Sequence, residues 1–364
     1  MFREHSFLSS LLMTAGKVIV TFFSLAWCFF ILGLVAGLVV SLGDETEAEI
    51  ASQYHYGQRF SENKLLSIPI SGVILGDRLE TDPSNFLIAS SITYGYEVKE
   101  QLYEAAEDES YKGVILEINS PGGTIFGSQA IVDGVNYYKE KTGKPVISYV
   151  GGMAASGGYW AAVSGDSIYA DVGTATGSIG VLFGPFKYYD QVISEDGGLL
   201  AGGVVTENGI KTVTFTAGKA KDFGNPYRQM SQEEMEHTQK VVDNEYDRFV
   251  KLVSQRRTIS DATLREDIGA FLYDPVSAKE KNLIDDVLNR EQAYQELANR
   301  ADVGDFFQVV QAEPELGFWG QLLSSQSILQ PLSRANESTP AVSPLCAHTS
   351  LVLAYHGDVP SLCL

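Results

Sequence analysis

The sequence has few residues of the kinds that bind metals or nucleic acids. It contains three cysteines and five histidines among 364 residues, and no pair of them has metal-ligand spacing. Lys and Arg total 26 against 46 Asp and Glu, which gives a formal net charge of −20. Phosphate binding needs Lys and Arg, so this balance excludes nucleic acid as a partner and argues against docking onto an anionic lipid surface. We expect neither a metal nor another cofactor.

Charge is also missing from one long apolar stretch, Val18 to Gly43, which has 26 residues. As a helix it would be about 39 Å long, enough to cross a hydrocarbon core of about 30 Å. A cleaved signal peptide is the alternative, but its apolar core should have only about 7–15 residues. Arg3 and Lys17 precede the stretch and acidic residues follow it. The charge asymmetry predicts a transmembrane anchor at 18–43, with residues 1–17 in the cytoplasm and everything after Asp44 outside.

The remaining chain divides by composition into three parts. Residues 44–64 are polar and predict a stalk, 65–312 hold the motifs of a catalytic domain, and 313–364 are Ser- and Pro-rich. Such a composition predicts a C-terminal tail with little order. Two cysteines, Cys346 and Cys363, lie in this tail on the expected exported side. There they could form a disulfide or remain separate thiols.

Apolar strands and helices alternate along the catalytic region. This order predicts parallel βαβ units and therefore an α/β fold. The expected strands are Leu66–Leu75, Gly113–Asn119 and Pro145–Val150, and the expected helices are Thr93–Glu109 and Ile125–Glu140. Further along we expect a strand at Lys211–Thr216, a loop at Gly218–Pro226, a capped helix from Ser231 to about Arg257, and a helical piece at Asp274–Leu288.

The stretch from Val150 to Leu182 contains no Lys, Arg or His, and small residues dominate its first half. The run Ala155–Val163 predicts a short apolar helix, with Ser156 at or just inside its N-terminus. There the unpaired N–H groups and the helix dipole would stabilise a developing anion, as acyl transfer from a serine requires. Alternatively, Ser156 only caps the helix.

A nucleophilic serine needs a base and an oxyanion hole. The histidines of the exported region lie in the stalk, in a polar helix or in the tail, so a Ser-His-Asp triad is poorly supported; they are His55, His237, His348 and His356. The other workable base is a lysine kept neutral by a dry pocket or by cationic neighbours. Gly122 and Gly123 follow a predicted parallel strand and would supply a backbone N–H, or else form only a tight βα turn.

Three motifs occur in order: INSPGG at Ile118–Gly123, AASGGYW at Ala154–Trp160 and TGSIG at Thr176–Gly180. Together they resemble the signature motifs of the signal peptide peptidase A family, in its single-domain, membrane-anchored form. The resemblance extends over roughly Leu66–Val287. It implies a Clp protease/crotonase-like fold of repeated βαβ units behind one N-terminal transmembrane helix. It also implies a serine endopeptidase with a Ser–Lys dyad.

The resemblance implies a role for individual residues. Ser156 corresponds to the nucleophile, Lys221 to the general base, Ser178 to the serine that orients the lysine, and Gly123 and Gly157 to the oxyanion donors, with Gly122 as the alternative to Gly123. Three features depart from the family pattern, one of which is the Gly-rich stretch 196–209, which has the character of an insertion. Ala217 and Ala220 stand where a serine and an aromatic or histidine are usual, and Lys219 lies only two residues from Lys221. Lys219 therefore remains an alternative base.

Members of this family form ring- or dome-shaped homo-oligomers in which neighbouring protomers supply the serine and the lysine. Their substrates are the remnant signal peptides left in the membrane after preprotein processing. The resemblance thus implies a bacterial-type plasma membrane, with the catalytic domain outside the cytoplasm. Two other functions are open: a crotonase-type enzyme acting on acyl-CoA, which would not need Ser156, and an inactive scaffold whose lysine is displaced by the Gly-rich stretch 196–209.

Overall fold

The computed structural model describes residues 52–77, 92–190, 209–312 and 353–355, along with 194–195, 204–205 and positions 17, 20, 22–25 and 27–32. The chain divides into two units, residues 1–49 and residues 50–364. Much of the predicted anchor at 18–43 lies outside the described residues. Its described positions are helical and expose large apolar side chains. Among the described residues no helix is both long and apolar enough to cross a bilayer, so the anchor stays a prediction.

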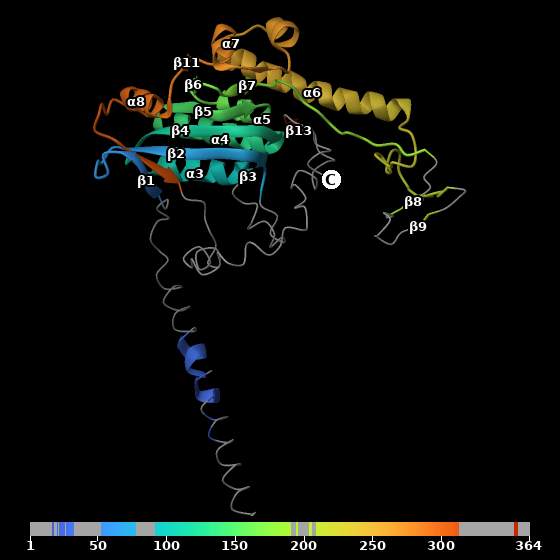
Figure 1. Cartoon of the computed structure of the whole chain (residues 1–364), viewed down its shortest axis with the longest axis horizontal. Helices are drawn as coiled ribbons and strands as arrows, with labels where there is room; N and C mark the ends of the chain where they lie inside the picture. The colour runs from blue at the N-terminus through green and yellow to red at the C-terminus, as the bar shows by residue number, and fades with distance from the viewer. Residues whose placement is uncertain are drawn as a thin grey trace, which may run out of the picture. The chain divides into compact units, whose positions relative to one another are not determined.

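A mostly parallel sheet forms the centre of the second unit (Figure 1). Its main strands lie in the order β1-β12-β2-β4-β5-β6-β11. The pairs from β12 to β11 are parallel, and only β1 at the edge of this path is antiparallel. The α/β prediction is confirmed. The strands are β1 (Ser52–Gly57), β2 (Lys64–Leu75), β4 (Tyr111–Thr124), β5 (Val146–Ala155), β6 (Ser167–Ala170), β11 (Asp286–Val287) and β12 (Gln308–Ala312).

Alternation along β2 distributes its side chains to the two faces of the sheet. Leu66, Ile68 and Ile70 join a large core with residues of helices α3 (Gly95–Glu107) and α4 (Ile125–Thr142). Leu65 joins a second core with residues of α8 (Arg290–Arg300). Helices therefore pack their apolar sides against both faces of the sheet, as parallel sheets require.

Helix boundaries follow capping residues that are visible in the sequence. Thr124 caps α4 by accepting from the N–H of Gly127, and Gly143 ends this helix in the left-handed region. The predicted cap at Ser231 is also confirmed. The Ser231 side chain accepts from the N–H of Glu234, whose carboxylate accepts from the N–H of Ser231, at the start of α6 (Gln232–Arg257).

Two expectations at the edges of the domain were wrong in part. The predicted stalk 44–64 contains β1, which pairs with β12. The ring of Tyr56 in β1 also packs 5.2 Å from that of Tyr294 in α8. The predicted tail 313–364 contains β13 (Leu353–Tyr355), which pairs antiparallel with the end of β4. Other residues of the tail, including Cys346 and Cys363, lie outside the described residues.

Two local predictions also differ from the structure. Lys211–Thr216 is not a strand, because its exposed residues have no partner strand in the described part of the chain. The helical piece predicted at Asp274–Leu288 is divided between α7 (Pro275–Glu280) and β11. Asn282 separates the two with φ 59°, a conformation that a continuing helix cannot contain.

Candidate active site

Ser156 lies between β5 and the short helix α5 (Gly157–Ala162), as the small-residue run predicts. Its side chain is fully buried, and its backbone has φ 54° and ψ −117°. A non-glycine residue held in such a sparsely populated region costs about 1–3 kcal/mol, so the surrounding structure must impose it. The hydroxyl makes no capping bond, and instead donates to the carbonyl of Gly180 at 3.3 Å. The capping alternative for Ser156 is therefore wrong.

Three side-chain contacts fix helix α5 behind Ser156. The indole of Trp160 packs 4.6 Å from the ring of Phe249 in α6, and its N–H donates to Gln129 at 3.0 Å. The hydroxyl of Tyr159 donates to the carbonyl of Leu283 at 2.8 Å. Burial raises the pKa of Tyr159, so this phenol stays a neutral donor. A helix held in this way keeps its N-terminal N–H groups at fixed positions.

The GSIG turn lies directly beside Ser156. Strand β7 (Ala175–Gly177) pairs with the end of β5, and the N–H of Ser156 donates to the carbonyl of Gly177 at 2.9 Å. Ser178 follows with φ 53°, is buried, and donates its backbone N–H to the carbonyl of Phe271 at 2.8 Å. Ser156 and Ser178 thus both have a positive φ, and a backbone hydrogen bond joins the segments on which they lie.

The Gly122–Gly123 pair ends strand β4 next to the same turn. The N–H of Gly122 donates to the hydroxyl of Ser120 at 3.1 Å, so that donor is already engaged. A side chain at Gly123 would place its Cβ 2.0 Å from the carbonyl oxygen of Ile74, so only glycine fits. Since Ser120 pairs with Ala154, the end of β4 lies beside the start of α5. Of the two glycines, Gly123 is the better candidate for an oxyanion donor together with Gly157.

One edge of β4 pairs with β2 at Gly122 and Gly123. A second strand of the same chain, β13, also pairs with β4 at these residues. Leu353–Tyr355 pairs antiparallel with Gly122–Thr124. The ring of Tyr355 packs against a small apolar cluster that includes Leu75 and Tyr94. At this edge an extended segment of the chain therefore pairs with β4 and packs a large apolar side chain on this cluster.

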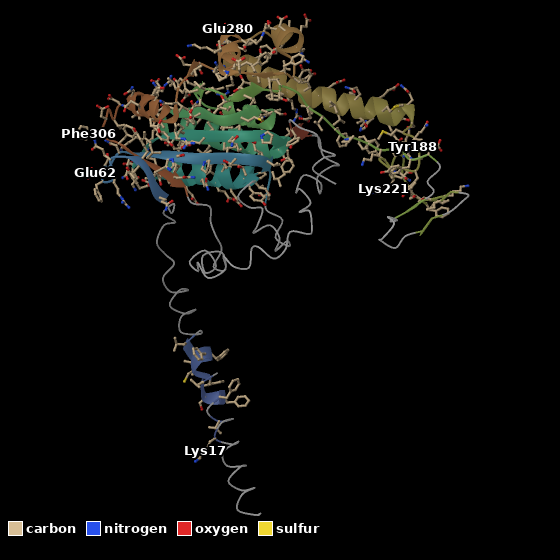
Figure 2. The ribbon with its side chains drawn as sticks, in the orientation of Figure 1. Lys17, Glu62, Tyr188, Lys221, Glu280 and Phe306 are labelled. Atoms are coloured by element: carbon tan, nitrogen blue, oxygen red, sulfur yellow. The ribbon has the colours of Figure 1, made fainter. Side chains whose placement is uncertain are left out.

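The two candidate lysines lie on the loop that precedes α6. Figure 2 labels Lys221 on this loop. Both lysines are exposed, and Lys219 forms an ion pair with Glu233 at 2.5 Å. This loop is tied to Glu234 at the start of α6, and Phe249 of the same helix contacts Trp160 of α5. Phe249 is the fifteenth residue after Glu234, which places it about 22 Å farther along the helix. The structure therefore does not bring either lysine to Ser156 within one chain.

Several residues that shape the site were not foreseen. Carbonyl groups of Gly180, Phe271 and Leu283 accept the bonds that fix Ser156, Ser178 and Tyr159, and a main-chain carbonyl leaves no sequence signal. Asn119 is different, because it belongs to the INSPGG motif. Its side-chain oxygen accepts from the N–H of Met153 at 3.2 Å and so joins β4 to β5 just before Ser156.

The model of peptidase family S49 matches residues 138–304, and the Clp protease model matches residues 87–169. An Enterococcus faecium protein whose name assigns it to signal peptide peptidase SppA is 30% identical over 73% of this chain and 72% of its own. A Methanocaldococcus jannaschii protein named as a protease is 36% identical over 56% of this chain and 61% of its own.

Protease 4 of Haemophilus influenzae is 32% identical over 66% of this chain, which spans only 34% of that relative. The matched regions contain all three motifs, so the resemblance deduced from them is confirmed. The chain therefore belongs to peptidase family S49, the signal peptide peptidase A family of serine proteases.

Proposed function

We propose that this chain is a serine endopeptidase in which Ser156 is the nucleophile and Lys221 is the general base. The observation that carries the proposal is the backbone of Ser156, held at φ 54° on the buried N-terminus of α5. Such strain is typical of functional sites, where it fixes a reactive group. A structural serine at this position would need neither the strain nor the glycine edge of β4 beside it.

The proposed reaction is acyl transfer in two steps. Lys221, as the neutral amine, accepts the proton of Ser156 while Oγ attacks the carbonyl carbon of the scissile peptide bond. The N–H groups of Gly123 and Gly157 stabilise the resulting oxyanion. Collapse of this intermediate breaks the C–N bond, the lysine returns its proton to the leaving amine, and an acyl-enzyme remains. Water, deprotonated by the same lysine, hydrolyses the ester and restores Ser156.

We propose that the lysine reaches the serine of a second copy of the chain. Helix α6 supports this, because its length of about 22 Å from Glu234 to Phe249 separates the lysine loop from α5. A head-to-tail contact, in which each copy lends its lysine to the next, forms a ring when the rotation between successive copies closes. In such a homo-oligomer Ser178, next to Ser156, would hold the incoming amine by a hydrogen bond.

For the substrate we propose remnant signal peptides, cleaved at the outer surface of a plasma membrane. Three observations support this: the name of the Enterococcus faecium relative, the apolar cluster that receives Tyr355, and the exposed apolar side chains in the first unit. The last group includes Phe22, Trp27 and Phe29, which would suit a lipid environment. Signal peptides are apolar. In an extended conformation, such a segment would pair with the edge of β4.

A fluorophosphonate probe tests the proposal on the full-length chain in detergent. We expect stoichiometric labelling of Ser156, detected by mass spectrometry, and loss of labelling in Ser156→Ala. An acyl-CoA enzyme of the same fold or an inactive scaffold would leave Ser156 unlabelled. Labelling of another serine with Ser156 unmodified would overturn the assignment of the nucleophile.

A further inference from the structure

The two residues after Lys221 are both held in place. The carboxylate of Asp222 accepts two hydrogen bonds from the guanidinium of Arg228, each 2.8 Å long. The ring of Phe223 stacks 6.1 Å from Phe183 and meets Phe186 edge-on at 5.0 Å. The backbone around Lys221 is therefore fixed although its side chain is exposed.

Arg228 makes a second two-pronged contact, with Glu234. Its Nη1 and Nη2 donate to the two carboxylate oxygens at 2.8 Å and 2.7 Å. Glu234 is nearly fully buried and also completes the capping box with Ser231. One planar guanidinium thus joins the lysine loop to the first turn of α6, a geometry that a lysine could not reproduce. We call Asp222, Arg228 and Glu234 the arginine clamp.

The clamp also determines which carboxylates near Lys221 are already paired with another side chain. Asp222 is its neighbour in the chain, and the guanidinium of Arg228 holds the pKa of that carboxyl below its usual range. Glu233, the other nearby carboxylate, is bonded to Lys219. Within the part of the chain that the structure describes, no ion pair engages Lys221. The segment 183–190 that packs on the loop adds two exposed charged residues, Lys187 and Asp190.

We propose that Arg228 is a positioning residue for Lys221, acting through Asp222 and Glu234. It fixes the lysine loop on α6 so that the amine is presented at a set position to the next copy. It also occupies the carboxylate of Asp222, which would otherwise pair with the ammonium form of Lys221 and favour the protonated, inactive base. This inference rests on the proposed function, in which Lys221 is the general base.

The test compares kcat and KM across pH for full-length Arg228→Ala, Arg228→Lys, Asp222→Asn and the double variant Arg228→Ala/Asp222→Asn. We expect Arg228→Ala to lower kcat at least about tenfold with little change in KM, since small misplacement of a catalytic group costs up to about 100-fold. Because the base acts as the neutral amine, activity should rise with pH. In Arg228→Ala this rise should lie at higher pH, because the freed Asp222 carboxylate stabilises the ammonium form of Lys221. Arg228→Lys should rescue only part of kcat.

The double variant separates the two effects. Without the Asp222 carboxylate, the rise in activity should return to the wild-type pH while kcat stays low. Arg265→Ala is the matched control, because the Arg265 side chain is 35% exposed against 32% for Arg228 and pairs at 2.7 Å with Asp247 of α6. It removes an arginine–carboxylate pair that joins residues 263–268 to α6, away from the lysine loop, so both kcat and the pH profile should stay at wild-type values.

Lys221→Ala distinguishes failure of the clamp from failure of the proposed function. An active Lys221→Ala would overturn the general base, and the clamp with it. An inactive Lys221→Ala together with an Arg228→Ala that matches Arg265→Ala in kcat and in pH profile would overturn the clamp alone. Should Arg228→Ala fail to fold, Asp222→Asn still decides. It leaves the bond between Arg228 and Glu234 intact, and wild-type kcat in this variant would contradict the proposal.

Discussion

The backbone N–H of Ser156 donates to the carbonyl oxygen of Gly177 at 2.9 Å. This bond joins two segments that carry separate motifs, the end of β5 and the GSIG turn. Gly177 has φ 127°, and its Cβ would lie 2.6 Å from the carbonyl oxygen of Phe271. The strained conformation of Ser156 therefore depends on a position where only glycine fits.

Gly177→Ala should destabilise the domain and reduce labelling of Ser156. The backbone strain alone costs about 1–3 kcal/mol, and the contact with Phe271 adds to it. Gly173→Ala is the control. Gly173 also has a positive φ, 83°, but a Cβ added there would have no neighbouring atom within 4 Å. Urea unfolding should show a clearly larger loss for Gly177→Ala. Equal losses would mean that the close approach to Phe271 does not matter.

Ser156→Ala should abolish hydrolysis and leave the fold intact. The hydroxyl caps no helix and makes one bond of 3.3 Å to Gly180. Losing such a bond costs about 0.5–1.5 kcal/mol, while loss of a serine nucleophile lowers kcat by on the order of 10⁶-fold. Peptide turnover and a melting curve on the same preparation check both numbers. A folded variant that retains turnover would contradict the role of Ser156.

Local sequence signals predicted the centre of the site. The small residues before Ser156 and the Ser231–Glu234 cap determine structure within a few residues, so these predictions were confirmed. Pairing between distant segments was missed: β1 and β13 complete the sheet from parts expected to be a stalk and a tail. The clamp on Arg228 was missed for a different reason: its partners are only six residues away, but one arginine between two acidic residues has no distinctive pattern.

Strand β13 covers the edge of β4 where a substrate strand would pair. Deleting residues 353–364 should therefore lower KM for an apolar peptide severalfold and leave kcat unchanged, because the edge at Gly122–Thr124 becomes free. Deleting only residues 357–364 keeps β13 and serves as the control. Identical KM values for the two deletions would show that β13 does not compete with substrate.

The arginine clamp should weaken in acid. Arg228 lowers the pKa of Glu234 from 4.5 to about 2 and lowers the pKa of Asp222 as well. Groups with a depressed pKa contribute stability above their unfolded-state pKa and lose it as pH falls through the folded-state pKa. The difference in melting temperature between wild type and Arg228→Ala should be constant above about pH 5 and shrink between about pH 4.5 and pH 2. A difference that grows as the pH falls would contradict this electrostatic account.

The central claim is that Ser156 of one copy acts with Lys221 of another, and co-assembly of two inactive variants tests it directly. Ser156→Ala keeps the lysine and Lys221→Ala keeps the serine, so an interface between them contains one complete site. Random mixing in equal amounts should restore about a quarter of wild-type activity, because a head-to-tail interface pairs the two intact residues in one of four arrangements. Each variant alone should stay inactive. Mixed oligomers, verified by two affinity tags, that remain as inactive as either variant alone would contradict the account.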